Sequence, residues 1–240
     1  DYVLAKFFKK TDVVFQGSIT RQRINQQKQI ILNLFDYQAW SVEQAIQVEA
    51  HISELLRYYP KSHDAFRQLL VYLDNQKIVI PTYRSLQDMF TQSFANERDR
   101  LDQLIVLMPH GQQKKLSELI AREDGITRLN ILRADQKNFT YTAISAEVEK
   151  ALGLEGLYKF AKEFLPTLLL SKNAIRYYAD IAGQYAASRL RRLDKPQQWL
   201  HALCYIYHRY QQIMDNLITS FMYHTRAITV DAKAYAEKAA

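Results

Sequence analysis

Apolar residues along this chain recur at the spacing of an α-helix almost everywhere. Leu86, Met89, Phe90 and Phe94, for example, are separated by three, one and four positions, which places them on one face of a helix. No alternation of apolar and polar residues continues far enough to form a sheet, and the β-branched run at 78–80 is the only extended piece predicted. The pattern therefore predicts an all-α fold with short connections.

Side chains that cap helices mark where several of these helices begin. The helix that follows Ser171 is expected to run to Leu193, and Pro196 suits the first turn of a final long helix. Gly153 and Gly156 are expected to bracket a turn. Further helix starts are predicted after Thr20, Ser41 and Thr140.

The clearest break in the pattern is Pro109-His110-Gly111, which contains two residue types that interrupt helices. We interpret it as the boundary between two helical modules, residues 1–110 and 111–240. The second module is expected to end in long helices. Because the chain contains only 6 glycines and 5 prolines, it offers no long flexible linker.

Composition narrows the class of protein. Of the 240 residues, 48% are apolar and 24% charged, which allows a full core and excludes wholesale disorder. Cys204 is the single cysteine, so no internal disulfide can form. The uncharged stretch 196–208 is shorter and more polar than a membrane span, which needs ~20 apolar residues, and no signal-peptide pattern is found. We expect a cytoplasmic protein and, because the chain begins with Asp1, a piece of a longer one.

Positive charge is concentrated in the second module. The formal net charge is +7, of which residues 1–110 contribute +1 and residues 111–240 contribute +6. A cluster of cations in the second module surrounds a single acidic residue, Asp194. Such a cluster favours binding of phosphates, although cations at a solvated helix end complement the helix dipole equally well. The cluster consists of Arg189, Arg191, Arg192 and Lys195.

A helix–turn–helix-like element is predicted around Pro81. One helix begins near Ser62, and a second follows Pro81, where free backbone N–H groups favour an anion such as a phosphate. Arg84 and Gln87 are expected on the outer face of this second helix, and both residue types suit base edges. An ordinary helical hairpin is the alternative. Residues 138–142 form a second segment of similar character.

Few residues are arranged for catalysis or for binding a metal. The sequence contains no nucleophile elbow, phosphate-binding loop or Cys-x-x-Cys motif. His201, Cys204 and His208 are spaced to share one helix face, and these residue types can bind zinc. Three ligands from successive turns of one helix fit a tetrahedral ion poorly, however, and a packed helix seam is the favoured interpretation.

Several stretches of the chain resemble a known family. Residues 80–87 read IPTYRSLQ, residues 96–101 read NERDRL and residues 171–179 read SKNAIRYYA. In their order and spacing these motifs resemble the N-terminal region of transposases of the Tn-three family, the enzymes of replicative class II bacterial transposons. Thr82 and Asp36 depart from the family, in which glycine is expected at both turns. The likeness also covers residues 195–199, 204–210, 215–217 and 223–224.

The resemblance implies a DNA-binding region that recognises the terminal inverted repeats of a transposon. The catalytic Asp/Asp/Glu carboxylates and their two metal ions would lie in a C-terminal half outside this chain, so no catalytic residue and no cofactor is assigned here. The interpretation assigns contacts with double-stranded DNA to residues of both modules: Arg21, Arg23, Lys28, Lys77, Tyr83, Arg84, Ser85, Gln87, Arg98, Arg100, Lys137, Thr140, Tyr141, Lys172, Asn173, Arg176, Arg189, Arg191, Arg192 and Lys195.

An alternative function belongs to a different class. The long helices after Ser171 and Pro196 also suit a helical interaction module that docks a partner or forms a homodimer without reading DNA. A zinc enzyme is a more distant alternative. Binding to an inverted repeat, compared with a scrambled duplex of equal length, distinguishes the first two functions.

Overall fold

The computed structural model describes residues 20–123, 126–136 and 138–239, and over these residues the all-α prediction is confirmed. The extended structure in this part of the chain is small. It comprises a hairpin of two-residue strands, β1 (Arg122–Glu123) and β2 (Ile126–Thr127), and an isolated bridge between Gln38 and Ile78. The predicted extended run at 78–80 therefore makes one bridge.

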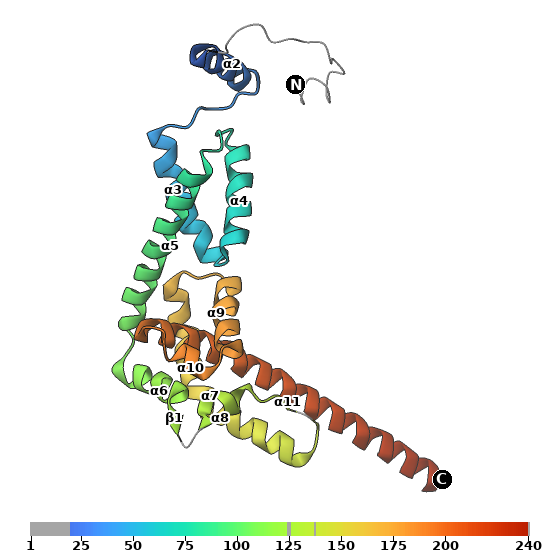
Figure 1. Ribbon diagram of the computed structural model, residues 1–240. Coiled ribbons are helices and arrows are strands. Elements are labelled where there is room, and N and C mark those ends of the chain that lie inside the picture. The colour runs from blue at the N-terminus through green and yellow to red at the C-terminus, as the bar shows by residue number, and fades with distance from the viewer. Residues whose placement is uncertain (1–19, 124–125, 137, 240) are drawn as a thin grey trace.

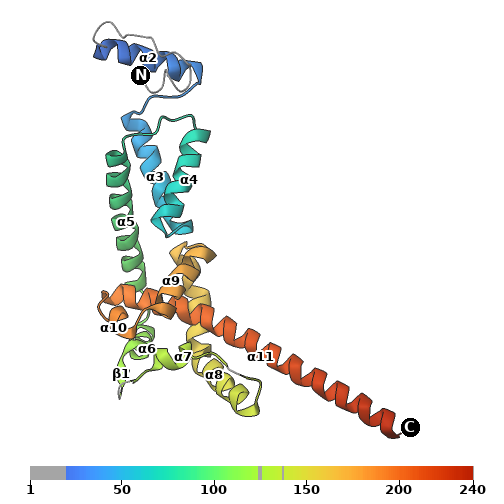
Figure 2. The same ribbon diagram turned by 45° about the vertical axis from the view of Figure 1, so that its right-hand side comes forward.

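Three helices of the N-terminal part form an up-and-down bundle. Figures 1 and 2 show α3, α4 and α5 side by side, with the chain direction reversing at each turn, whereas α2 stands apart from them. α3 packs against both α4 and α5, whereas α4 and α5, which residues 76–82 connect, make few contacts with each other. The bounds are α2 (Arg21–Leu34), α3 (Val42–Tyr58), α4 (Ser62–Asn75) and α5 (Tyr83–Val106).

The second part is built around the last helix. α8 and α9 both pack along α11, which crosses the body and then continues beyond it (Figure 1). The bounds are α6 (His110–Ile120), α7 (Arg128–Arg133), α8 (Tyr141–Phe164), the 3-10 helix η1 (Leu165–Leu168), α9 (Lys172–Gln184), α10 (Ala187–Leu190) and α11 (Lys195–Ala239).

The predicted caps are confirmed. Ser41 Oγ accepts a hydrogen bond from the Gln44 backbone N–H at 3.4 Å, and Ser171 Oγ accepts one from Ala174 at 3.1 Å. Each bond satisfies one of the N–H groups that a helix start leaves without an intrahelical partner. Thr20 and Thr140 cap α2 and α8 in the same way.

Two predictions about helix bounds are wrong. Gly153 and Gly156 do not bracket a turn but lie inside α8, whose packing against α11 outweighs the weak helix propensity of glycine. The helix after Ser171 ends at Gln184 rather than Leu193. Its end is held by Arg133, whose guanidinium donates to the Ala182 carbonyl and, at 2.6 Å, to the Tyr185 carbonyl. A separate short helix, α10, follows.

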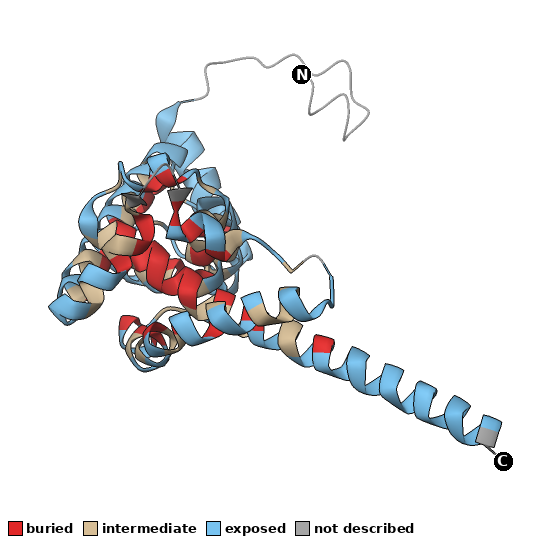
Figure 3. Cartoon of the chain, turned by 90° about the horizontal axis from the view of Figure 1, so that it is seen from below, coloured by how far each residue is buried: buried red, intermediate tan, exposed pale blue. Residues whose placement is uncertain are grey.

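The core consists of two hydrophobic clusters that share one helix. The first joins α3, α4 and the beginning of α5, which contributes Leu86 and Phe90. The second joins α6 to α11 with the end of α5, which contributes Leu101 and Ile105. Figure 3 shows buried residues gathered in the body and absent from most of the projecting part of α11. The core thus changes from one cluster to the other within α5, before the boundary predicted at residues 109–111.

A buried ion-pair network joins the two parts. Glu97, which is 7% exposed, accepts hydrogen bonds from Arg100 at 2.8 and 2.5 Å and lies 3.7 Å from Arg57. Arg100 also donates to the Leu168 carbonyl at 2.9 Å. Because the network contains groups from α3, α5 and η1, it fixes the bundle to the rest of the molecule.

Helices that could span a membrane are not found among the described residues: none of them is both long enough and apolar enough.

Candidate nucleic-acid interface

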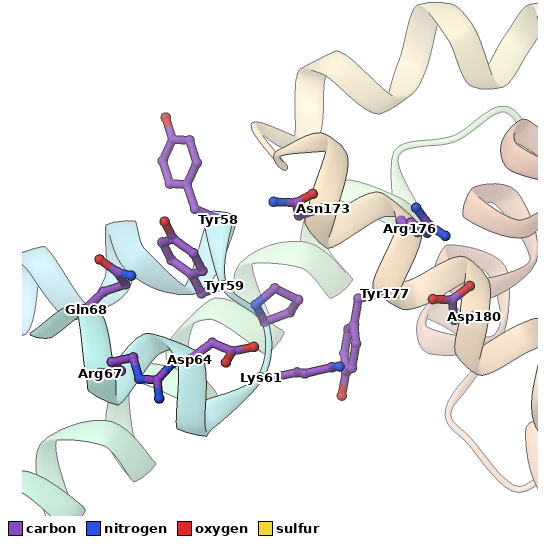
Figure 4. A pocket seen from close by; sticks show the side chains of 11 residues that line it. Tyr58, Tyr59, Lys61, Asp64, Arg67, Gln68, Asn173, Arg176, Tyr177 and Asp180 are labelled. Atoms are coloured by element: carbon purple, nitrogen blue, oxygen red, sulfur yellow. The ribbon is translucent and has the colours of Figure 1, made fainter.

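A cleft of about 350 Å³ lies between the α3–α4 turn and α9 (Figure 4). The side chains of Lys61 and Tyr177 approach each other across it, while Asn173 and Arg176 face it from α9. Its lining combines cationic, amide and tyrosine side chains with two carboxylates. The lining residues are Tyr58, Tyr59, Pro60, Lys61, Asp64, Arg67, Gln68, Asn173, Arg176, Tyr177 and Asp180.

The cleft has a fixed frame because the start of α9 is bonded to the end of α3. The Ser171 backbone N–H donates to the Arg57 carbonyl at 3.0 Å, and Ser171 Oγ donates to the Tyr58 carbonyl at 3.2 Å. Carbonyls at the end of a helix lack intrahelical partners, so these bonds satisfy α3 while they position α9. The same serine caps α9, and therefore one side chain sets both walls of the cleft.

Three cations of the cleft are available to a ligand. Among the described residues, no hydrogen bond or ion pair engages the side chains of Lys61, Arg67 or Arg176, and all three are exposed. Asp64 and Asp180 oppose them, which leaves a net charge of +1 in the lining. Arginine forms bidentate hydrogen bonds with phosphate, and tyrosine can donate to phosphate or stack on a base.

Part of this site was predicted and part was missed. Asn173 and Arg176 line the cleft, and Lys172 lies exposed at the start of the same helix. Lys61 and Arg67 were not predicted because each is an isolated cation in the sequence, more than a hundred positions from α9. The contact between α3 and α9 brings them there, and no local sequence signal predicts that contact.

The start of α5 presents the residues predicted to read bases. Leu86 and Phe90 are buried in the first cluster, so Arg84 and Gln87 face solvent, as predicted. Tyr83 is likewise exposed, and Ser85 is half-buried, with its N–H donating to Thr82 Oγ1 at 3.2 Å. Thr82 has an extended backbone (φ −61°), so this turn does not require the glycine expected in the family.

Cations on α2 and at the end of α4 are exposed but differ in their surroundings. Lys77 has a left-handed backbone (φ 54°), and its ammonium lies 5.0 Å from the centre of the Tyr37 ring. Asp36, with φ 57°, also occupies the left-handed region, so the glycine expected there would relieve strain. On α2, Leu32 alone is buried, whereas Ile24 and Ile31 are exposed. The exposed α2 cations are Arg21, Arg23 and Lys28.

Two arginines of α5 that are predicted to contact DNA have protein partners in the structure. Arg98 donates to Asp194 at 2.6 Å and lies 3.7 Å from Asp102. Arg100 is committed to Glu97 and to the Leu168 carbonyl. These guanidiniums hold the end of α5 against other elements, and we leave both out of the proposed interface.

The cationic cluster of the second part extends from the end of α10 through the following turn to the start of α11. Arg189 lies 3.8 Å from the centre of the Tyr185 ring, and Arg191 donates to the Ile120 carbonyl at 3.4 Å. Lys195 Nζ donates to Gln198 at 3.4 Å, while Arg192 is exposed. The acidic residue expected to sit within this cluster, Asp194, pairs with Arg98 instead.

The segment before α8 offers one exposed aromatic residue. Tyr141 is among the most exposed large side chains. The Thr140 hydroxyl caps α8 and also donates to Asn138 Oδ1 at 2.7 Å. Lys137 lies outside the described residues.

Two of the three candidate zinc ligands, His201 and Cys204, are buried, whereas His208 is half-buried. His201 Nδ1 lies 3.2 Å from the Tyr178 carbonyl, and burial lowers the pKa of His201, an effect that this hydrogen bond partly offsets. Cys204 is fully buried, and burial raises the pKa of its thiol. His208 lies 3.3 Å from the Gln212 amide. Within the described residues no group of three or more His, Cys, Asp or Glu side chains is placed to hold a metal ion.

No protein-family model matches this chain, and no curated protein matches it significantly. The chain is therefore assigned to no family by these comparisons. The resemblance to transposases of the Tn-three family stays a prediction from the motifs.

Proposed function

We propose that this chain binds double-stranded DNA and recognises the terminal inverted repeats of a bacterial transposon, as the DNA-binding part of a transposase of the Tn-three family. The family assignment rests on the sequence motifs alone. In this proposal the chain acts in the bacterial cytoplasm at the nucleoid, and the catalytic carboxylates with their metal ions lie outside these residues. No reaction is assigned to the chain itself.

The observation that carries the proposal is the convergence of unpaired cations on one cleft. Lys61 and Arg67 come from the start of α4 and Arg176 from α9, and the protein provides no ion pair for any of them in the part that the structure describes. Because these cations lack protein partners, a polyanion that lies along the cleft can pair with all three. Displacement of counterions from the duplex adds to the affinity.

The same duplex can reach both the cleft and the start of α5. α4 has 14 residues and separates the two sites, which corresponds to about 21 Å at the rise of an α-helix. This length is shorter than one turn of duplex, ~34 Å. We assign phosphate contacts to the cleft and base contacts to Arg84 and Gln87, which are exposed at the other end of α4.

A salt titration with a cleft variant tests this function. Fluorescence anisotropy with a labelled duplex gives the slope of log K against log salt concentration, and each lost phosphate contact lowers its magnitude by about 0.9. The triple variant Lys61→Ala, Arg67→Ala, Arg176→Ala is expected to lower the slope by about 2.7 on specific and scrambled duplexes alike.

A matched control variant loses the same net charge as the cleft variant, but at a different place on the molecule. Arg226→Ala, Lys233→Ala and Lys238→Ala remove three exposed cations from the projecting end of α11 and are expected to leave the slope nearly unchanged. Equal slopes for the two triple variants would contradict the cleft as the interface. Failure of the native chain to bind any duplex would reject DNA binding altogether.

A helical interaction module remains the second candidate. The observation that favours it is the projecting end of α11, which contacts little of the body and carries exposed apolar residues.

A further inference from the structure

The last helix leaves the body of the protein while it still carries apolar residues. Residues 200–206 of α11 are buried, but between 214 and 238 only Ser220 is. Figure 3 shows this part of the helix extending away from the remaining elements. A lone helix in water is marginally stable and gains most of its stability from packing an apolar face. The projecting part of α11 therefore lacks the packing that its composition suggests.

The apolar residues on this projection follow a heptad repeat. Met214, Phe221, Ile228 and Tyr235 are spaced by seven positions and are 36%, 72%, 69% and 78% exposed. A second series at the same interval begins four residues after Met214. Alternating steps of four and three are the signature of a coiled-coil seam. The second series consists of Ile218, Thr225 and Ala232.

Neither series contains a charged residue, and the body leaves the seam open. The ring of Phe139 stacks on Tyr223 at 4.9 Å, and its carbonyl lies 2.7 Å from His224 Nε2. Gln136 bonds to Ser220. These contacts occupy a neighbouring face of α11, and Ile218 and Phe221 on the seam stay exposed.

We infer that this seam pairs with the same seam of a second copy of the chain, with the two helices antiparallel. In the antiparallel arrangement centred between residues 226 and 227, each residue of the second series meets a residue of the first series. Phe221 then faces Ala232 of the second copy, and Thr225 faces Ile228. Large residues meet small ones in these layers, as close packing requires.

A parallel arrangement fits the same residues less well. It would stack Phe221 on Phe221 and Ala232 on Ala232 of the second copy, so that wide and narrow layers alternate. Narrow layers leave voids, and wide ones hold the helices apart. Size complementarity therefore selects the antiparallel pair.

The area available is sufficient for a stable dimer. Aromatic side chains bury ~150–250 Å² each, so Phe221 and Tyr235 supply about 300–500 Å² per copy. The aliphatic seam residues Met214, Ile218 and Ile228 bring the total toward ~800 Å² per partner, the size of a standard specific interface. Because the seam lies far from the cleft of Figure 4, dimerisation does not depend on the proposed function.

The oligomeric state of the chain tests the inference. We expect sedimentation equilibrium, or light scattering on a size-exclusion column, to show a dimer in the absence of DNA. Protein concentrations from ~1 to ~100 µM span the affinities of ordinary protein complexes. Ile228→Glu places a charge in the seam twice per dimer and is expected to weaken dimerisation by ~100-fold or more.

Val230→Glu is the matched control. Val230 is 64% exposed, close to the value for Ile228, and it lies two positions along the helix, on the opposite face. This variant is expected to remain dimeric, and helicity measured by circular dichroism verifies that both variants fold. A native chain that is monomeric over the whole range, or an equal loss for both variants, would overturn the inference.

Single-cysteine crosslinking tests the direction of the helices. The native Cys204 is fully buried and does not interfere. Under mild oxidation, a mixture of the Phe221→Cys and Ala232→Cys variants is expected to give a crosslinked heterodimer, while each variant alone stays uncrosslinked. Crosslinking of each variant with itself would show a parallel pair and reject the antiparallel arrangement.

Discussion

The two ends of α5 both carry arginines and use them in opposite ways. At the start, Arg84 faces solvent and has no side-chain partner among the described residues. At the end, Arg98 and Arg100 are bonded to Asp194, Glu97 and a backbone carbonyl. The first end is thus free to bind a ligand, while the second holds the molecule together.

The difference comes from one buried carboxylate. A charge that is removed from water is tolerated only when it is paired and hydrogen-bonded. Glu97 is buried, and it therefore draws Arg57 and Arg100 toward itself. The acidic residue nearest to Arg84 on the helix face, Asp88, is exposed and needs no such partner. Burial of Glu97 thus engages Arg57 and Arg100, while Arg98 is held by its own ion pairs with Asp194 and Asp102.

Removal of the buried carboxylate has the largest expected effect. Glu97→Ala leaves Arg100 and Arg57 without their acidic partner at a buried junction, and the loss in the free energy of unfolding is expected to be ~3–5 kcal/mol. Urea denaturation followed by circular dichroism measures it. Asp99→Ala, on the exposed side of the same turn, is the control and is expected to change the value by less than ~0.5 kcal/mol. Similar values for the two variants would remove the contrast between the ends of α5.

The exposed end is expected to control DNA sequence preference. If Arg84 and Gln87 contact base edges, each contact contributes ~1–3 kcal/mol of discrimination. The double variant Arg84→Ala, Gln87→Ala should therefore lose affinity for the inverted repeat and retain its affinity for a scrambled duplex. Competition anisotropy with the two duplexes measures the ratio. An equal loss on both duplexes would show that these residues contact only phosphates.

A pH titration tests how the buried His201, which lies near the second end of α5, affects the stability of the fold. His201 lines a cavity together with Glu97 and Asp102, and burial lowers its pKa. As pH falls below ~6.5, the unfolded chain binds a proton at this residue before the folded chain does, so stability falls toward acid by at most ~1.4 kcal/mol per pH unit. His201→Asn keeps a donor for the Tyr178 carbonyl and should flatten this part of the profile. Urea midpoints between pH 7.5 and 5 check it, and parallel profiles for the two proteins would exclude His201 as the source.

The smallest effect is expected from a hydroxyl at the exposed end. Tyr83→Phe removes one donor to phosphate, with an expected loss of ~0.5–1.5 kcal/mol in binding. Because phosphate contacts carry no sequence information, specific and scrambled duplexes should lose equally. A loss confined to the inverted repeat would instead assign Tyr83 to base contact.

Local signals in the sequence predicted the features that depend on local physics. The caps at Ser41 and Ser171 and the outward position of Arg84 follow from a few neighbouring residues, and the structure confirms them. The end of α9 depends on Arg133, about fifty positions earlier, and no neighbouring residue indicates it. Local propensity at Gly153 likewise gave the wrong result, because packing of α8 against α11 decides the conformation there.

Local sequence signals likewise predicted only part of the candidate cleft. Asn173 and Arg176 could be predicted because they lie in one motif. Lys61 and Arg67 could not, since bonds between distant segments, such as those of Ser171 to the end of α3, bring α4 beside α9. Long-range contacts of this kind depend on the whole fold.

The passage of α5 through both hydrophobic clusters has a consequence for the order in which the chain folds during synthesis. The first cluster draws on residues 48–90, so it can form as soon as α5 has left the ribosome, whereas the second needs residues as late as Ile213. Contacts between positions close in sequence form faster than distant ones. The early bundle stabilises α5 as a helix and thereby presents Leu101 and Ile105 in their final spacing. The later helices then assemble on a template that is already in place.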